Sequence, residues 1–160
     1  MKAVKYLSKL SDVVNTVAKY FVFFVMIFLV VIVFAEVIAR SILNTSLRYT
    51  EEIVIYSMAW MVFIGAGIAA KENALISIVG LLQSLTPKAL RLITIIGNIL
   101  IITLLAWIVK SGISYALTNI AQLSPTLQIP MMYPYLSIPV GCAILLLHYI
   151  NSVLKLFSRK

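Results

Sequence analysis

The sequence predicts an all-α integral membrane protein with four transmembrane helices, an amphipathic N-terminal helix and an interfacial helix between the second and third spans. Of the 160 residues, 62% are hydrophobic and only 11% are charged, and the mean hydropathy is +1.08. A soluble domain of this size needs far more polar surface. Helical segments of roughly 20 apolar residues cross the ~30 Å hydrocarbon layer of a membrane. Four segments lack any charged residue: Tyr20–Ala35, Ile53–Ala70, Leu92–Val109 and Tyr135–Leu154.

These segments predict one membrane domain over residues 1–160, with spans at about 20–40, 51–70, 88–110 and 135–156. The first segment is short, but it continues past Glu36 through Val37–Ala39. A cleaved signal peptide is the alternative for this basic and hydrophobic N-terminus. The hydrophobic run is too long for one and shows no small-x-small cleavage site, so a retained membrane helix is favoured.

Basic residues are distributed unevenly between the two sides of the membrane that these spans define. Of the 13 lysines and arginines, only Arg40, Arg48 and Lys110 lie on the side opposite the termini. Cytoplasmic loops are enriched in Lys and Arg, so both termini are predicted to be cytoplasmic. The net charge of +8 is then explained by orientation and by contact with membrane lipids. No basic stripe interleaved with aromatic residues is present, and no nucleic-acid partner is expected.

Two helices are predicted outside the spans. Polar residues recur every three or four positions between Lys2 and Lys19, so this segment is an amphipathic helix that either lies on the membrane surface or runs straight into the first span. A similar polar stripe predicts the interfacial helix at about 73–85. Thr86 and Pro87 follow as the expected N-cap and first residue of the third span, whose helix could extend to about Ala121.

Small residues lie near the end of the second span. Gly65 and Ala69, and Ala66 and Ala70, are four residues apart, a spacing that allows another helix to approach closely. This contact is expected either within the chain or with a partner subunit.

Charged residues are concentrated around the first outer connection. Glu36 and Arg40 are one helical turn apart, as are Arg48 and Glu52. Glu51 and Glu52 also fall in a first helical turn, where the helix dipole favours negative charge. A lone glutamate in a span suggests proton coupling, but a nearby arginine favours the ionised form. Structural pairing, within the chain or with a partner, is therefore favoured.

The second outer connection is rich in proline. Four of the five prolines lie between Ser124 and Gly141. Proline interrupts helices and restricts the residue before it, so we expect a stiff, extended edge available to partners. The candidate contact or structural residues here are Pro125, Pro130, Tyr133 and Pro139.

The chain is not expected to be an enzyme or to bind a cofactor or metal. Cys142 is the single cysteine and cannot form a redox pair, and His148 is the single histidine. We expect Cys142 to be buried in apolar surroundings and His148 to lie at the membrane interface, with a proton relay as the alternative. Thr94 and Asn98 are expected to form interhelical hydrogen bonds.

Several short motifs resemble one known family. They are Glu36–Arg40 (EVIAR), Thr50–Glu52 (TEE), Trp60–Gly65 (WMVFIG), Ser124–Pro130 (SPTLQIP) and Tyr135–Gly141 (YLSIPVG). In this order, and with four spans, they resemble the small membrane subunit (DctQ-like) of tripartite ATP-independent periplasmic (TRAP) transporters.

The resemblance implies a role in a three-part, cation-driven, usually sodium-coupled, symport system of the bacterial inner membrane. A periplasmic binding protein would deliver a carboxylate-containing solute to a large multi-spanning transport subunit that moves like an elevator. The small subunit would be a scaffold that braces the large one. The alternative hypothesis is a small oligomeric proton-coupled exporter that uses Glu36.

Overall fold

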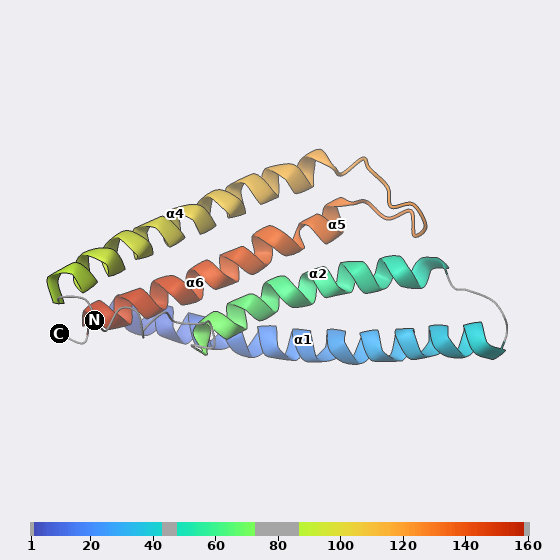
Figure 1. Ribbon diagram of the computed structural model, residues 1–160, viewed down its shortest axis with the longest axis horizontal. Coiled ribbons are helices and arrows are strands. Elements are labelled where there is room, and N and C mark those ends of the chain that lie inside the picture. Colours follow the sequence, from blue (N-terminus) through green and yellow to red (C-terminus); the bar gives the residue numbers. More distant parts are fainter. Residues whose placement is uncertain (1, 43–47, 73–86, 159–160) are drawn as a thin grey trace.

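A computed structural model gives the fold of the chain and describes residues 2–42, 48–72 and 87–158. This part of the chain is helical apart from its connections (Figure 1). The helices are α1 (Lys2–Ile42), α2 (Arg48–Lys71), α4 (Pro87–Thr118), α5 (Met132–Tyr135) and α6 (Ser137–Ser158).

Four of these helical stretches are long and apolar enough to cross a membrane, which confirms the predicted fold class. They are Tyr6–Ile42, Arg48–Lys71, Ile95–Thr118 and Met132–Leu154. Both termini lie at the same end of the molecule, as four crossings require (Figure 1). We call this the terminal end, and the opposite end, with the α1–α2 and α4–α5 connections, the loop end. The predicted interfacial helix at 73–85 and the Thr86 cap lie outside the described residues.

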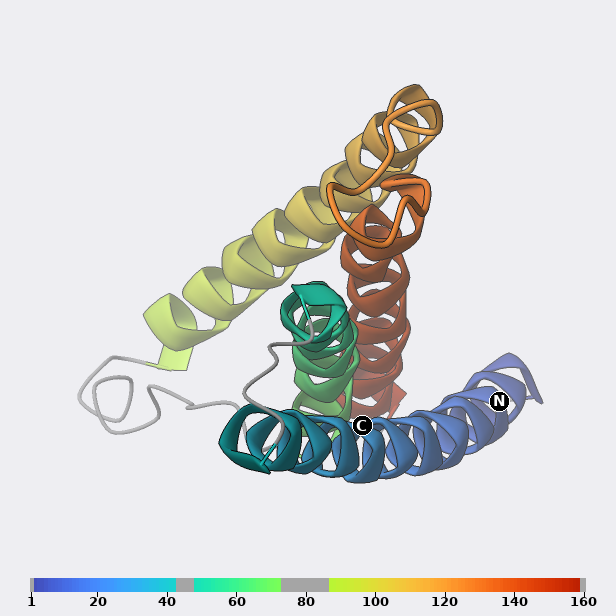
Figure 2. The same cartoon turned by 90° about the vertical axis from the view of Figure 1, so that its right-hand side faces the viewer.

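The helices form an open arrangement and not a closed four-helix bundle. The α2–α6 pair is at the centre, α1 packs on α2 and on part of α6, and α4 packs on α6 and α5. Viewed end-on, α1 and α4 lie on different sides of the central pair (Figure 2). Broad faces of the outer helices α1 and α4 are therefore left for lipid or for another protein.

Two glycines allow α2 and α6 to pack closely. A Cβ added at Gly141 would lie 2.5 Å from Phe63 Cβ, and one added at Gly67 would lie 2.7 Å from Ile144 Cγ2. By contrast, a Cβ added at Gly65 would meet no atom within 4 Å. The small-residue contact within the chain is thus made by Gly67 and not by Gly65, so only the partner contact remains as a prediction for Gly65.

Helix α1 is continuous over 41 residues, or about 60 Å, roughly twice the hydrocarbon thickness. The N-terminal segment therefore runs straight into the first span. Its polar side is fixed to the end of α2: Lys71 Nζ donates to Ser11 O at 2.7 Å and to Asp12 Oδ1 at 2.6 Å. A second ion pair joins Lys19 to Glu72.

His148, expected at the membrane interface, has a buried side chain between two helices. Its side chain is only 2% exposed, and its Nδ1 lies 2.8 Å from Ser11 Oγ in a buried contact between α6 and α1. Asn15 and Asn151, about one turn away on the same two helices, are also buried. The long α1 covers this face of α6 and encloses the side chain, while the position of His148 relative to the membrane interface stays a prediction.

Two smaller predictions are confirmed. Tyr149 OH donates to Asn98 Oδ1 at 2.6 Å, an interhelical hydrogen bond between α6 and α4. Cys142 is a free, buried thiol. The side chain of Thr94 lies outside the described part.

Candidate functional site

The proline-rich connection between α4 and α5 is folded back on itself. Ser124 N donates to Ile129 O at 2.9 Å and Met131 N donates to Gln122 O at 2.8 Å. An isolated β-bridge pairs Leu123 with Pro130. The prediction of an extended edge is therefore wrong, because these backbone hydrogen bonds close a compact turn at residues 124–130.

Gln128 lies at the tip of this turn and has a left-handed backbone, with φ of 55°. Its side-chain Nε2 donates to Ser124 O at 3.1 Å and to Pro125 O at 3.0 Å. Residues other than glycine rarely adopt this conformation, so the turn depends on such surrounding contacts.

Glu52 connects this turn to the start of α2. One carboxylate oxygen accepts from Thr126 N at 2.7 Å and the other accepts from Leu127 N at 3.0 Å. Hydrogen bonds to a charged acceptor are roughly twice as strong as neutral ones. The contact fixes the position of the turn above the α2–α6 pair.

The predicted pairing of Arg48 with Glu52 is not what the described part of the chain forms. Both oxygens of Glu52 accept backbone N–H groups of the turn, while Arg48 is exposed at the first position of α2. The two residues are four positions apart on α2, but the Glu52 carboxylate faces residues 124–130.

The predicted proline and tyrosine candidates have different environments. Pro125 is exposed and Tyr133 is 56% exposed. Pro130 is half-buried in the bridge with Leu123. Pro139 is fully buried in the first turn of α6, against Gly112 of α4, where an added Cβ would lie 3.1 Å from its Cδ. Pro139 is therefore a packing residue, whereas Pro125 and Tyr133 remain available for contact.

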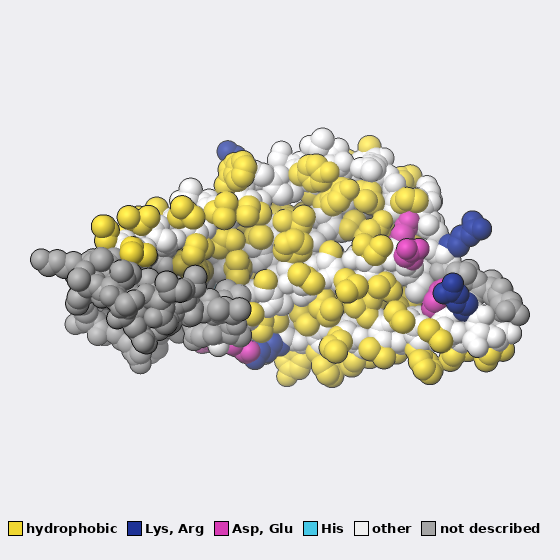
Figure 3. All heavy atoms as spheres, viewed as in Figure 1, with side chains coloured by type: hydrophobic (Ala, Val, Ile, Leu, Met, Phe, Trp, Pro, Cys, Tyr) yellow, Lys and Arg dark blue, Asp and Glu magenta, His cyan; other side chains and the backbone are white. Residues whose placement is uncertain are grey.

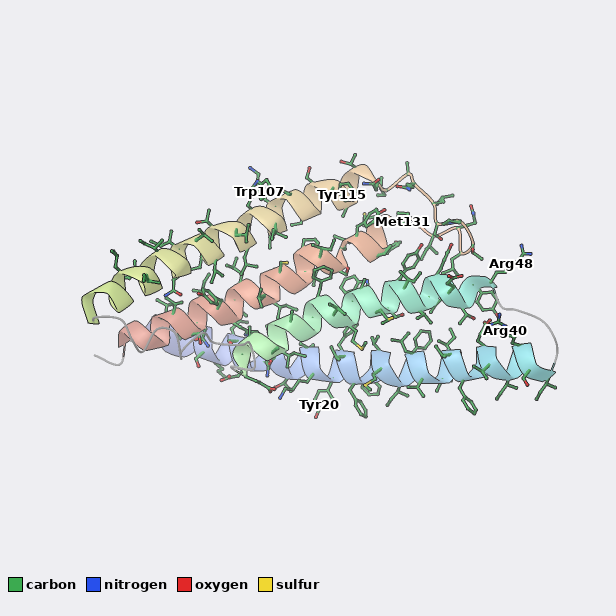
Figure 4. All side chains as sticks on the ribbon, viewed as in Figure 1. Tyr20, Arg40, Arg48, Trp107, Tyr115 and Met131 are labelled. Atoms are coloured by element: carbon green, nitrogen blue, oxygen red, sulfur yellow. The ribbon has the colours of Figure 1, made fainter. Side chains whose placement is uncertain are left out.

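The other charged candidates surround a single hollow of about 700 Å³ at the loop end, which we call the charged hollow. Acidic and basic side chains are gathered at this end of the surface (Figure 3). Arg40 comes from α1 and Arg48 from α2, and both lie beside the α1–α2 connection (Figure 4). The lining residues are Glu36, Arg40, Arg48, Thr50, Glu51, Val54, Ile55 and Thr126.

Three contacts of the α4–α5 connection and its neighbours were not found from the sequence. The backbone N–H groups of Thr126 and Leu127 have no sequence signal, because every residue except proline carries one. Tyr56 OH donates to Met131 Sδ at 3.4 Å, and its position one turn after Glu52 could have indicated a shared face of α2. The rings of Tyr115 and Tyr135 lie 5.1 Å apart.

This arrangement can position a loop and bind charged groups. Among the described residues, no group of three or more His, Cys, Asp and Glu side chains is placed to hold a metal ion. The hydrogen bonds of Glu52 are made to backbone groups, so its visible role is to position the turn.

Comparison with known proteins identifies the family of the chain. Residues 29–159 match the family model described as the DctQ component of tripartite ATP-independent periplasmic transporters. A protein of Haemophilus influenzae named as a TRAP transporter small permease protein is 24% identical over 131 residues, covering 79% of this chain and 81% of that protein. The chain therefore belongs to the DctQ family, a component of tripartite ATP-independent periplasmic transporters.

Proposed function

We propose that the chain is the scaffold subunit of a TRAP transporter, where it braces a large multi-spanning transport subunit in the bacterial inner membrane. The complete system would take up a carboxylate-containing solute, delivered by a periplasmic binding protein and driven by a cation gradient such as sodium. The observation that carries this proposal is the open arrangement of the helices, with α1 and α4 on different sides of the α2–α6 pair.

Helix α4 offers an extended face for a large partner. Trp107 on this face is 66% exposed. Beside it lies an open apolar hollow lined by Ile96, Ile99, Leu100, Thr103, Leu104 and Trp107. This hollow has almost no polar groups, and a groove between α1 and α2 is equally apolar. Such surfaces suit contact with lipid or a neighbouring helix, whereas a path for a charged solute needs polar groups.

The loop end is suited to contact with a periplasmic binding protein. The turn at 124–130 is held in place by Glu52 and presents exposed residues such as Pro125. Arg40, Arg48 and Glu51 are exposed beside it. Charged and polar groups at a rim guide association and orientation.

The proton-coupled exporter considered from the sequence is not favoured. Glu36 lines the charged hollow at the loop end together with Arg40 and Arg48, and the family is that of a transporter component.

The proposal is tested by reconstitution. The chain alone in liposomes is expected to give no solute uptake above empty liposomes, whereas co-expression with a large TRAP transport subunit is expected to yield a complex that survives purification. Uptake is then expected only when the binding protein is added. Solute flux by the purified chain alone, or no complex on co-expression, would contradict the scaffold role.

The orientation needs its own experiment. We expect both termini in the cytoplasm, since most basic residues lie at the terminal end. Single cysteines introduced as Thr126→Cys and Lys88→Cys in a Cys142→Ser background should react with an impermeant thiol reagent from opposite sides of the membrane. In intact spheroplasts, only the cysteine at position 126 should react with the reagent. Labelling of both from one side would refute the four-span topology.

A further inference from the structure

An apolar groove between α1 and α2 lies next to the charged hollow. The groove has a volume of about 440 Å³, and Val54 lines both spaces. The other groove residues are Leu29, Val30, Val33, Phe34, Val37, Met58 and Met61. A charged space at the loop end thus lies beside an apolar one between two membrane-spanning helices, and Val54 is in the wall of both.

The charges of the hollow are balanced. Arg40 and Arg48 bring two positive groups, and Glu36 and Glu51 bring two negative groups. Arginine recognises phosphate well because its guanidinium donates several hydrogen bonds in a fixed plane. Carboxylates bind ammonium groups. A lining of both signs complements a ligand that itself carries both signs.

Thr50 gives a second and independent indication of a polar ligand. This residue lines the hollow but is only 4% exposed. Its Oγ1 is buried without a hydrogen-bond partner in the described part of the chain. Buried hydroxyl groups are normally paired, since an unpaired one costs about 1–3 kcal/mol. A polar headgroup in the hollow would supply the missing partner once the Thr50 side chain rotates toward it.

The groove beneath has the properties required for an acyl chain. Its lining is almost entirely apolar. Val33, Phe34 and Met58 are exposed large side chains on its two walls. Methionine side chains are flexible and fit chains of irregular shape.

We propose that the charged hollow and the apolar groove together bind one phospholipid whose zwitterionic headgroup carries a primary ammonium. The phosphate lies between Arg40 and Arg48, the ammonium lies toward Glu51, and one acyl chain follows the groove between α1 and α2. A lipid of net negative charge fits less well, because its headgroup brings no cation to Glu51. Arg40, Arg48 and Glu51 also belong to the surface proposed for contact with a binding protein, but lipid binding to the isolated chain can be measured whether or not the scaffold proposal holds.

Native mass spectrometry of the delipidated full-length chain tests the site. Dioleoyl phosphatidylethanolamine is titrated, and phosphatidylglycerol with the same acyl chains is the comparison lipid. We expect one phosphatidylethanolamine bound, with at least about tenfold weaker binding in the Arg40→Gln/Arg48→Gln variant. The matched control is Lys110→Gln, which removes an exposed cation of α4 and should bind like the unchanged protein. Val33→Trp, which fills the groove and leaves the charges, should also weaken binding.

Circular dichroism and elution volume establish that each variant is folded. All these substitutions are at exposed positions, so loss of binding with an unchanged spectrum supports the site. Retention of phosphatidylethanolamine within twofold by the double-arginine variant would overturn the proposal. Equal binding of phosphatidylglycerol would overturn the proposed preference for a zwitterionic headgroup. A complex in which a partner subunit covers Arg40 and Arg48, and in which no lipid is co-purified, would show that a protein occupies the hollow. That result would also refute the lipid site.

Discussion

Gly141→Ala is expected to push α2 and α6 apart and to lower the thermal stability of the chain strongly. The new Cβ would lie 2.5 Å from Phe63 Cβ and 2.6 Å from both the backbone C and O of Phe63. Backbone atoms cannot move aside as a flexible side chain can, so the helices themselves must shift. Overpacking typically costs about 1–3 kcal/mol, and a contact with backbone belongs at the upper end. The melting temperature of the purified chain in detergent measures the effect.

Two matched glycines of α2 test this explanation. Gly67→Ala should destabilise less, because its close neighbour is the Ile144 side chain at 2.7 Å. Gly65→Ala should leave the melting temperature unchanged or slightly raised, since nothing lies within 4 Å of the added Cβ and alanine favours helix more than glycine does. If Gly65→Ala destabilises as much as Gly141→Ala, the close α2–α6 contact is not the cause of the lower melting temperature.

Glu52→Gln is expected to release the turn at 124–130 from α2. The substitution keeps the shape of the side chain but removes the charge, and one of its two oxygens becomes an amide NH₂ that cannot accept from Thr126 N or Leu127 N. Hydrogen exchange of the Thr126 and Leu127 amides should become at least about tenfold faster. In the assembled transporter, uptake and complex yield should fall, while insertion into the membrane should be unchanged.

Glu51→Gln is the control for this experiment. It removes the same charge from the neighbouring position, but Glu51 is exposed and does not contact the turn through any hydrogen bond in the described part of the chain. Exchange in the turn should stay as in the unchanged protein. Equal acceleration in both variants would indicate a general charge effect at the start of α2 and would exclude the specific contact of Glu52.

The spans were predictable because their signal is local. Hydrophobic length and the absence of charge fix where a helix crosses a membrane, and Pro87 marks the start of α4 as expected. Asn98 could also be identified as a hydrogen-bonding residue, since a polar amide in a span needs a partner. None of these inferences requires knowing which helices are neighbours.

Several differences between prediction and structure depend on how distant segments meet. Gly65 and Gly67 are equally small, and only the rotation of α2 against α6 makes Gly67 the contact. Glu52 had a suitable arginine one turn away, yet its partners are amides about 75 residues later in the sequence. His148 is covered because α1 continues far beyond the span. Such contacts are set by the relative position of elements, which local patterns do not encode.

The position of α4 has a consequence for biosynthesis. The α1–α2 pair can form as soon as both helices have left the ribosome and entered the membrane, because they pack on each other. The main partners of α4 are α5 and α6, which follow it in the chain. Helix α4 therefore lacks its main packing partners in the membrane until α6 is made. A nascent chain that stops after Thr118 holds a paired α1–α2 hairpin and an unpaired α4, which is exposed to quality-control proteases.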